Sequence, residues 1–298
     1  MNIIEDIRKN VVSDLFATAA IQNCWPIWLT RARDIIGQQP TAQSVLRIGD
    51  HLSEIFQLTN QGGRNQGALT TGGTAWESLI TWYINLCTAQ SRVVAIKKTS
   101  SLPSPVKDAI TVNYQNYACS SESDITILVF PDDPRFTEEN RDLYTNRGSI
   151  KKGALDELVG DTFTRFEVGI IQCKTNWNDN AQIPMLWDMI YTAGRFPGRQ
   201  ISVGINNYSI QHLGVFTYAF ATVPTNRLDL YKVDSLCVER VKNLSGGNYW
   251  GYPSRNGVAR NIKEVFQNYA DGYNNRNIRL TLQTALEQLN GDYSYFQL

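Results

Sequence analysis

The chain of 298 residues is poor in the residues that build metal clusters and disulfide scaffolds. It has two histidines, which lie far apart, and an odd number of cysteines with no C-x-x-C pair. A zinc site with Cys and His ligands and a disulfide framework are therefore not expected. Widely spaced thiols are typical of a reducing compartment, so we expect a cytoplasmic protein. The cysteines are Cys24, Cys87, Cys119, Cys173 and Cys237.

The sequence also lacks a long apolar run and a net charge. No stretch approaches the roughly 18 apolar residues of a membrane span, and the acids within residues 1–16 argue against a signal peptide. The formal charge of zero lowers the expectation of a nucleic-acid partner, because phosphate contacts need lysine and arginine. Acids are concentrated in residues 131–142, however, and many basic residues lie elsewhere, so neutrality of the whole chain does not exclude DNA.

Several catalytic motifs are missing as well. There is no G-x-x-x-x-G-K-[ST] phosphate-binding loop, so no nucleotide cofactor is expected. No G-x-S-x-G supports a serine hydrolase. His51 and His212 are isolated, which argues against nuclease sites that are built on paired histidines.

The N-terminal third predicts helices. Apolar residues at helical spacing predict amphipathic helices at 3–19 and 43–58. Residues 59–73 are polar and rich in glycine, which predicts a loop. A further helix is expected after this loop, with Thr74 as its N-cap and Glu77 at the capping-box position.

From about residue 92 the chain changes to short β-rich runs. Residues 131–160 form a polar, charged excursion that we expect outside the core. Helical spacing returns at 181–193, 258–266 and 278–290. The pattern predicts an α/β fold with one mixed central β-sheet flanked by helices. The β-rich runs are 92–98, 109–114, 124–130, 166–174, 200–206 and 215–223.

One of these runs, FEVGIIQCKT at 166–175, reads as a buried strand that becomes polar at its end. Because side chains alternate along a strand, Gln172 and Lys174 project to the same side, and Cys173 offers its backbone carbonyl. Asp124 stands at the start of another buried strand. If the two strands are neighbours, a carboxylate, an amide oxygen, a carbonyl and an ammonium converge. Hard oxygen ligands of this kind suit Mg²⁺ that is shared with a phosphate, and a nearby lysine can orient the attacking water.

These residues resemble the PD-(D/E)xK nuclease superfamily, and type II restriction endonucleases of restriction–modification systems in particular. The resemblance covers about residues 62–222, and it implies a restriction-endonuclease-like core that uses Mg²⁺. Asp124 corresponds to the first acid, Gln172-Cys173-Lys174 to the (D/E)-x-K element, and Glu77 to the helix glutamate that often joins the site. The implied catalytic residues are Asp124, Gln172, Lys174 and Glu77, and the implied metal ligands are Asp124, Gln172, the Cys173 carbonyl and Glu77.

The sequence departs from the family pattern in two ways. Gln172 stands where an acid is usual, which removes one negative charge from the metal site. The spacing of 48 residues from Asp124 to Gln172 is long for a hairpin, which we explain by an insertion at 131–160. Glu167 does not replace the missing acid, because it alternates to the opposite face from Gln172. The rest of the chain is expected to belong to the same single nuclease domain, 1–298, with a helical region at 1–61 and a C-terminal region at 223–298 packed on the core.

Amide-rich predicted loops are candidates for reading DNA bases, because Asn and Gln pair with adenine and Arg pairs with guanine. Ordinary turn chemistry explains the same residues equally well. The loops at 205–212 and 243–257 have this composition too, and Lys97 and Lys98 are either phosphate contacts or a solvated strand end. The chosen DNA-binding candidates are Arg64, Asn65, Gln66, Asn178, Asp179, Asn180 and Gln182.

The resulting hypothesis is a Mg²⁺-dependent restriction endonuclease that cleaves double-stranded DNA at a specific short sequence. Symmetric cleavage of both strands with one site per chain implies a homodimer. Two alternatives stay open. One is a structure-selective nuclease of the junction-resolvase or repair type, and the other is a non-catalytic DNA-binding protein on the same scaffold.

Overall fold

The computed structural model describes residues 2–59, 69–115, 117–120, 123–175, 201–223, 232, 234–244, 249–251 and 275–298. The helices expected at 181–193 and 258–266 lie outside these ranges. None of the described helices combines the length and the hydropathy that a membrane span requires.

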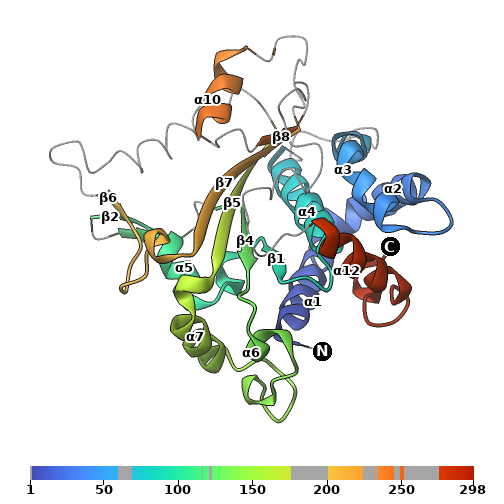
Figure 1. The fold of residues 1–298 in the computed structure, drawn as a ribbon. Coiled ribbons are helices and arrows are strands. Elements are labelled where there is room, and N and C mark those ends of the chain that lie inside the picture. The colour runs from blue at the N-terminus through green and yellow to red at the C-terminus, as the bar shows by residue number, and fades with distance from the viewer. Residues whose placement is uncertain are drawn as a thin grey trace.

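A mixed five-stranded sheet with the order β1-β4-β5-β7-β8 forms the centre of the fold (Figure 1). Antiparallel pairing joins β1 to β4 and β4 to β5, and parallel pairing joins β5 to β7 and β7 to β8. A smaller antiparallel sheet has the order β3-β2-β6. The central strands are β1 (Val93–Ile96), β4 (Ile125–Val129), β5 (Glu167–Lys174), β7 (Val215–Thr222) and β8 (Tyr249–Gly251), and the others are β2 (Val112–Tyr114), β3 (Tyr117–Cys119) and β6 (Ile201–Val203).

Helices lie on both faces of the central sheet, which confirms the expected mixed α/β class. The α-helices are α1 (Ile3–Phe16), α2 (Ala19–Ile36), α3 (Ala42–Gln57), α4 (Leu69–Cys87), α5 (Ser104–Ile110), α6 (Pro134–Thr137), α7 (Lys152–Asp161), α10 (Leu236–Leu244) and α12 (Asn275–Glu287). Short 3₁₀ turns are η3 (Thr99–Ser101), η4 (Arg141–Leu143), η5 (Phe163–Arg165), η7 (Ile210–His212) and η9 (Ser294–Phe296).

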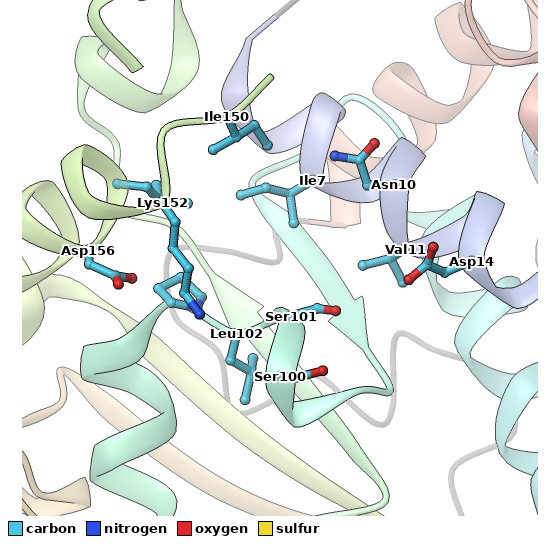
Figure 2. A pocket seen from close by; sticks show the side chains of 12 residues that line it. Ile7, Asn10, Val11, Asp14, Ser100, Ser101, Leu102, Ile150, Lys152 and Asp156 are labelled. Atoms are coloured by element: carbon cyan, nitrogen blue, oxygen red, sulfur yellow. The ribbon is translucent and has the colours of Figure 1, made fainter. Parts of the chain in front are cut away.

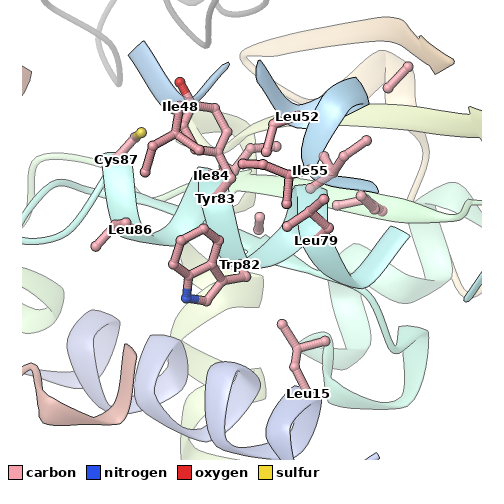
Figure 3. Packing of buried hydrophobic residues seen from close by; sticks show 14 of the residues in the cluster. Leu15, Ile48, Leu52, Ile55, Leu79, Trp82, Tyr83, Ile84, Leu86 and Cys87 are labelled. Carbon is pink, nitrogen blue, oxygen red and sulfur yellow. The ribbon is translucent and has the colours of Figure 1, made fainter. Parts of the chain in front are cut away.

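Two apolar clusters lie on opposite faces of the central sheet. Odd-numbered residues of β1, β4 and the end of β5 pack in a cluster with α2, α3, α4 and α12, and Figure 3 shows Trp82 and Tyr83 of α4 within it. Even-numbered residues of the same strands pack in a second cluster with α5, α7 and the first turns of α1. Because side chains alternate along a strand, this division identifies the face to which each strand residue belongs.

Buried polar groups attach α4 to the edge strand β1. The Asn85 side chain accepts a hydrogen bond from the Ala95 N–H (3.1 Å) and donates one to the Ala95 carbonyl (2.8 Å), so it pairs with the free edge of the sheet. The fully buried Arg8 of α1 binds Glu5 and donates to the Val93 carbonyl (2.7 Å). These bonds fix the long α4 helix relative to the strand ends.

The helices expected at 3–19, 43–58 and 278–290 correspond to α1, α3 and α12. The prediction that Thr74 caps a helix, with Glu77 at the capping-box position, is wrong. The helix already begins at Leu69, and the carbonyls of Thr74 and Glu77 accept hydrogen bonds from the hydroxyls of Ser78 and Thr81 within it. Burial of the apolar face of α4 outweighs the cost of about 1 kcal/mol that each glycine of its first turns adds.

Three further predictions need correction. The excursion at 131–160 does not lie outside the core, because Phe136 and Val159 are fully buried in the second cluster. The run at 109–114 is only partly a strand, since its first residues end α5. The sheet also continues beyond the core boundary expected at 222, because β8 pairs with β7.

Candidate functional site

The strand that directly follows Asp124, β4, and the strand that carries Lys174, β5, are neighbours, so the condition on which the expected site depends is met. β4 and β5 are antiparallel, and Ile125 pairs with Ile171. One step further along this register, Asp124 lies across from Gln172. The Cys173 N–H donates a hydrogen bond of 2.8 Å to Oδ2 of Asp124, which holds the carboxylate against the polar end of β5.

Gln172 and Lys174 share one face of the sheet. Cys173 packs in the cluster with α4, whereas Ile170 belongs to the cluster on the other face. Gln172 and Lys174 follow Ile170 in alternation, so they lie on its face, and the register places Asp124 on that face too. The Gln172 side chain is buried and Lys174 is half-buried.

The Cys173 carbonyl points toward the Asp124 side of β5. In an antiparallel ladder, the N–H and the C=O of one residue point to the same neighbour, and the N–H of Cys173 meets Asp124. The next carbonyl, that of Lys174, accepts a hydrogen bond of 3.0 Å from the Val223 N–H on the β7 side. The predicted main-chain oxygen ligand therefore lies on the carboxylate's side of the strand.

Glu77 reaches the same end of the sheet from the opposite layer. It is carried by α4, and the neighbouring Trp76 anchors this part of the helix by donating from Nε1 to the Ala221 carbonyl (3.3 Å). Oε2 of Glu77 forms an ion pair of 3.2 Å with Nζ of Lys97, the residue that follows β1. Glu77 is thus close to the predicted centre, and a lysine holds its carboxylate.

Three charged side chains of the site act on the Glu77 carboxyl group. Burial raises the pKa of Glu77, the Lys97 ammonium lowers it, the Asp124 carboxylate raises it, and the Lys174 ammonium lowers it. Burial also raises the pKa of the Cys173 thiol, with the same two acids and the same two lysines acting on it. The thiol therefore stays protonated, which leaves the carbonyl of Cys173 as its contribution to the site.

The donor set of the site suits Mg²⁺. Asp124 offers a carboxylate, Gln172 an amide oxygen and Cys173 a carbonyl, and all of these are hard oxygen ligands. Within the described ranges there is no group of three or more His, Cys, Asp and Glu side chains that could hold a metal ion. The residues fit an ion that protein oxygens hold only in part and that keeps waters or substrate oxygens in its coordination sphere.

Lys97 is the site residue that sequence reasoning missed. Its two predicted roles were a phosphate contact and a solvated strand end, but its ammonium binds α4. The signal that points to this arrangement is alternation, because Lys97 continues the odd-numbered series of Val93 and Ala95 that faces α4. Lys98 points elsewhere and forms an exposed ion pair with Asp14 (3.1 Å).

Two hollows lie away from this site. Glu167 pairs with Val129 at the far end of the β4–β5 ladder, in agreement with its exclusion from the site, and it lines a hollow of about 490 Å³ there. A second hollow of about 220 Å³ lies between α1, η3 and α7, as Figure 2 shows, with Lys152 and Asp14 in its lining. Neither hollow is lined by Asp124, Gln172 or Lys174.

The chosen DNA-binding candidates lie outside the described residues, and so do most of residues 243–257. In the described loop at 205–212, the asparagines have the conformations and contacts of an ordinary turn. Asn206 and Asn207 adopt positive φ angles of 53° and 66°, and the Asn206 amide donates to Asp108 (3.0 Å). The candidates that lie outside the described ranges are Arg64, Asn65, Gln66, Asn178, Asp179, Asn180 and Gln182, and they stay predictions.

Comparison with known proteins does not assign the chain to a family. No family model matches it, and no curated protein matches it. What the site can do must therefore be inferred from its own residues.

Proposed function

We propose that the protein is a Mg²⁺-dependent type II restriction endonuclease, a site-specific phosphodiester hydrolase of double-stranded DNA. The observation that carries the proposal is the hydrogen bond between the Cys173 N–H and Asp124 at the joined ends of two antiparallel strands. Gln172 and Lys174 follow on the face of Asp124, in the order that the PD-(D/E)xK pattern requires.

Asp124, the Cys173 carbonyl and the Gln172 amide oxygen would hold the ion. Bound Mg²⁺ would supply Lewis-acid stabilisation of the negative charge that grows on the phosphate oxygens. The sheet contributes the placement of these groups, because β4 and β5 fix their backbones. Such a pre-organised arrangement needs no rearrangement during the reaction.

Lys174 would act on the attacking water and on the phosphate. Its ammonium lies at the end of β5, where its charge reaches Glu77 and Cys173. Hydrogen bonds from the ammonium orient the water for attack on phosphorus and stabilise the added negative charge, while one P–O bond of the backbone breaks. Glu77 would accept hydrogen bonds from the surrounding water through its second oxygen.

The remaining features of the proposal follow from this chemistry. One centre per chain cuts one strand, so cleavage of both strands at a palindrome calls for a homodimer. Hydrolysis needs no nucleotide cofactor. The enzyme would meet its DNA in the cytoplasm.

The test is digestion of a fully sequenced genome with the purified protein and Mg²⁺ at several salt concentrations, followed by mapping of the fragment ends. A restriction enzyme gives discrete fragments whose ends share one short sequence. Preference for four-way junctions over linear duplex would instead identify a structure-selective nuclease. Absence of cleavage of both the genomic duplex and the four-way junctions at every salt concentration, with Mg²⁺ and with Mn²⁺, would refute both nuclease proposals.

A second candidate function is a non-catalytic DNA-binding protein on the same scaffold. Gln172 favours it, because a neutral amide in place of an acid weakens the attraction for a divalent cation. This candidate predicts DNA binding without cleavage and no effect of Lys174→Ala on that binding. An electrophoretic mobility assay with and without Mg²⁺ separates the two functions.

A further inference from the structure

The Lys97 ammonium is held by three acceptors of α4. Nζ lies 2.9 Å from the Thr74 carbonyl, 2.9 Å from Oγ of Ser78 and 3.2 Å from Oε2 of Glu77. A lysine ammonium has three N–H donors, so these contacts fill its capacity. The Lys97 side chain is 16% exposed. It is therefore a fixed internal cation, and a phosphate could bind it only by displacing one of these partners.

This cation changes the charge of the site. Asp124 and Glu77 contribute two negative charges, Lys97 and Lys174 contribute two positive charges, and Gln172 contributes none. The formal charges of these five side chains therefore sum to zero before any metal binds. One divalent ion gives an excess of positive charge that a phosphate can balance. A second ion would double that excess in a partly buried place, where uncompensated charge is costly.

The positions of Glu77 and Lys97 also favour a single divalent ion. A second ion beside Glu77 would have to share this carboxylate with the Lys97 ammonium, whose Nζ already lies 3.2 Å from Oε2. Glu77 and Lys97 come from the α4 side of the sheet, whereas Asp124 aligns with Gln172 on the other face. The ammonium therefore already supplies a positive charge beside Glu77, on the α4 side of the sheet.

We infer that Lys97 is a built-in second cation, which holds Glu77 in place and limits the site to one divalent ion, bound at Asp124. Lys97 is a positioning residue, because it acts through Glu77 and touches no reacting atom. The inference rests on the proposed metal-dependent nuclease, and it specifies how many ions that nuclease uses.

The experiment counts bound Mn²⁺ by electron paramagnetic resonance during titration of the purified chain of 298 residues. The wild type is expected to bind one ion. Lys97→Met keeps the length of the side chain but removes the charge, which releases Glu77, so this variant is expected to bind two ions. Lys97→Arg keeps the charge and is expected to bind one.

Two controls connect the change to the ion pair. Lys98→Met removes the same charge from the adjacent residue, whose ammonium pairs with Asp14 at the surface, and should still bind one ion. The double variant Glu77→Gln/Lys97→Met lacks the released carboxylate and should return to one ion. Circular dichroism of each variant shows whether it is folded.

The outcomes separate the two proposals. Two ions on the wild type, or one ion on folded Lys97→Met, would overturn the inference about Lys97 and leave the nuclease proposal standing. No bound ion on the wild type would overturn the inference together with the metal site of the proposed function. If Lys97→Met does not fold, two ions on the charge-preserving Lys97→Arg variant would overturn the inference.

Discussion

Lys174 is the residue whose removal separates DNA binding from chemistry in the proposed mechanism. Its ammonium stands on the face of Gln172 and acts electrostatically on Glu77. Lys174→Met should lower the rate of DNA cleavage by about 10²–10⁴-fold, the usual contribution of a positioned acid–base group. The affinity for duplex should change by less than about tenfold, because one cationic contact is lost. Single-turnover cleavage and a mobility-shift titration measure the two quantities.

Lys98→Met is the matched control for this variant, since it removes the same charge from an exposed pair with Asp14. Its cleavage rate should equal that of the wild type. If Lys174→Met cleaved DNA as fast as this control, Lys174 would have no part in catalysis.

Gln172 sets the charge of the proposed metal site. Gln172→Glu places a second carboxylate beside Asp124 in a buried position. Without metal, this change should lower the free energy of unfolding by about 1–3 kcal/mol, because a buried charge replaces a neutral amide. Mg²⁺ should then raise the melting temperature of the variant more than that of the wild type, because an ion that binds only the folded chain stabilises it.

Differential scanning fluorimetry with and without Mg²⁺ measures this difference. Gln211→Glu makes the same substitution at an exposed residue of η7 and should show the wild-type response. Equal Mg²⁺ responses of the two variants would argue against an ion at Gln172.

At the scale of the element, α4 shows where sequence patterns succeed and where they fail. The apolar spacing after residue 74 predicts the helix, because the burial of one face repeats with the helical period. Its start at Leu69 is not predicted, because the glycines before Thr74 are typical of loops and only tertiary packing outweighs their low helix propensity. The ion pair of Glu77 with Lys97 cannot be predicted from the sequence either, because it depends on how α4 crosses the end of β1.

The contact between α3 and α4 depends on a glycine. A methyl group at Gly49 of α3 would collide with the hydroxyl of Tyr83, which donates to the Leu46 carbonyl (2.8 Å). Gly49→Ala should therefore lower the free energy of unfolding by about 1–3 kcal/mol. Gly153→Ala in α7 is the control, because a methyl group there meets nothing within 4 Å, and it should be neutral or stabilise by up to about 1 kcal/mol.

Urea denaturation measures both changes. Tyr83→Phe in the Gly49→Ala background should cost less than the sum of the two single changes, because the collision is with the hydroxyl. If Gly49→Ala were as stable as Gly153→Ala, the two helices would not be in close contact at this position.

For the whole molecule, the sequence predicts the class of the fold, and it places the candidate site residues at the ends of two strands whose pairing only the structure shows. Buried strands carry their polar residues at their ends, and a mixed sheet can bring Asp124 next to Cys173. The sequence does not show that the segment at 131–160 covers one face of the sheet, because its buried apolar residues, Phe136 and Val159 among them, are few and interspersed with charged and polar residues. It also does not show that the chain returns after residue 222 to add β8, since this pairing is between segments far apart in the sequence.

The charges of this covering segment should make the stability of the fold depend on pH. Hydrogen bonds from Arg135 and Arg165 hold the pKa of Asp133 well below its usual value, and its carboxylate also caps α6. The contribution of this ionised group is present above the ordinary carboxyl pKa of about 4 and is lost as the pH falls below it. Asp133→Asn, which can still cap the helix, should be less stable than the wild type at about pH 7, and the difference should shrink toward about pH 3.

Glu77 contributes to the pH dependence with the opposite sign. Burial raises its pKa in the folded chain, so its contribution to stability is fully present below the ordinary pKa of about 4.3 and falls as the pH rises through the higher folded value. Over the range from about pH 3 to pH 7, Glu77→Gln should therefore gain stability relative to the wild type as the pH rises above about 4, whereas the deficit of Asp133→Asn should grow only up to about pH 5 and stay constant above it. Urea denaturation of the wild type and both variants across this range tests the two signs together. Parallel pH profiles for the two variants would show that at least one of these carboxyl groups has no altered pKa in the folded protein.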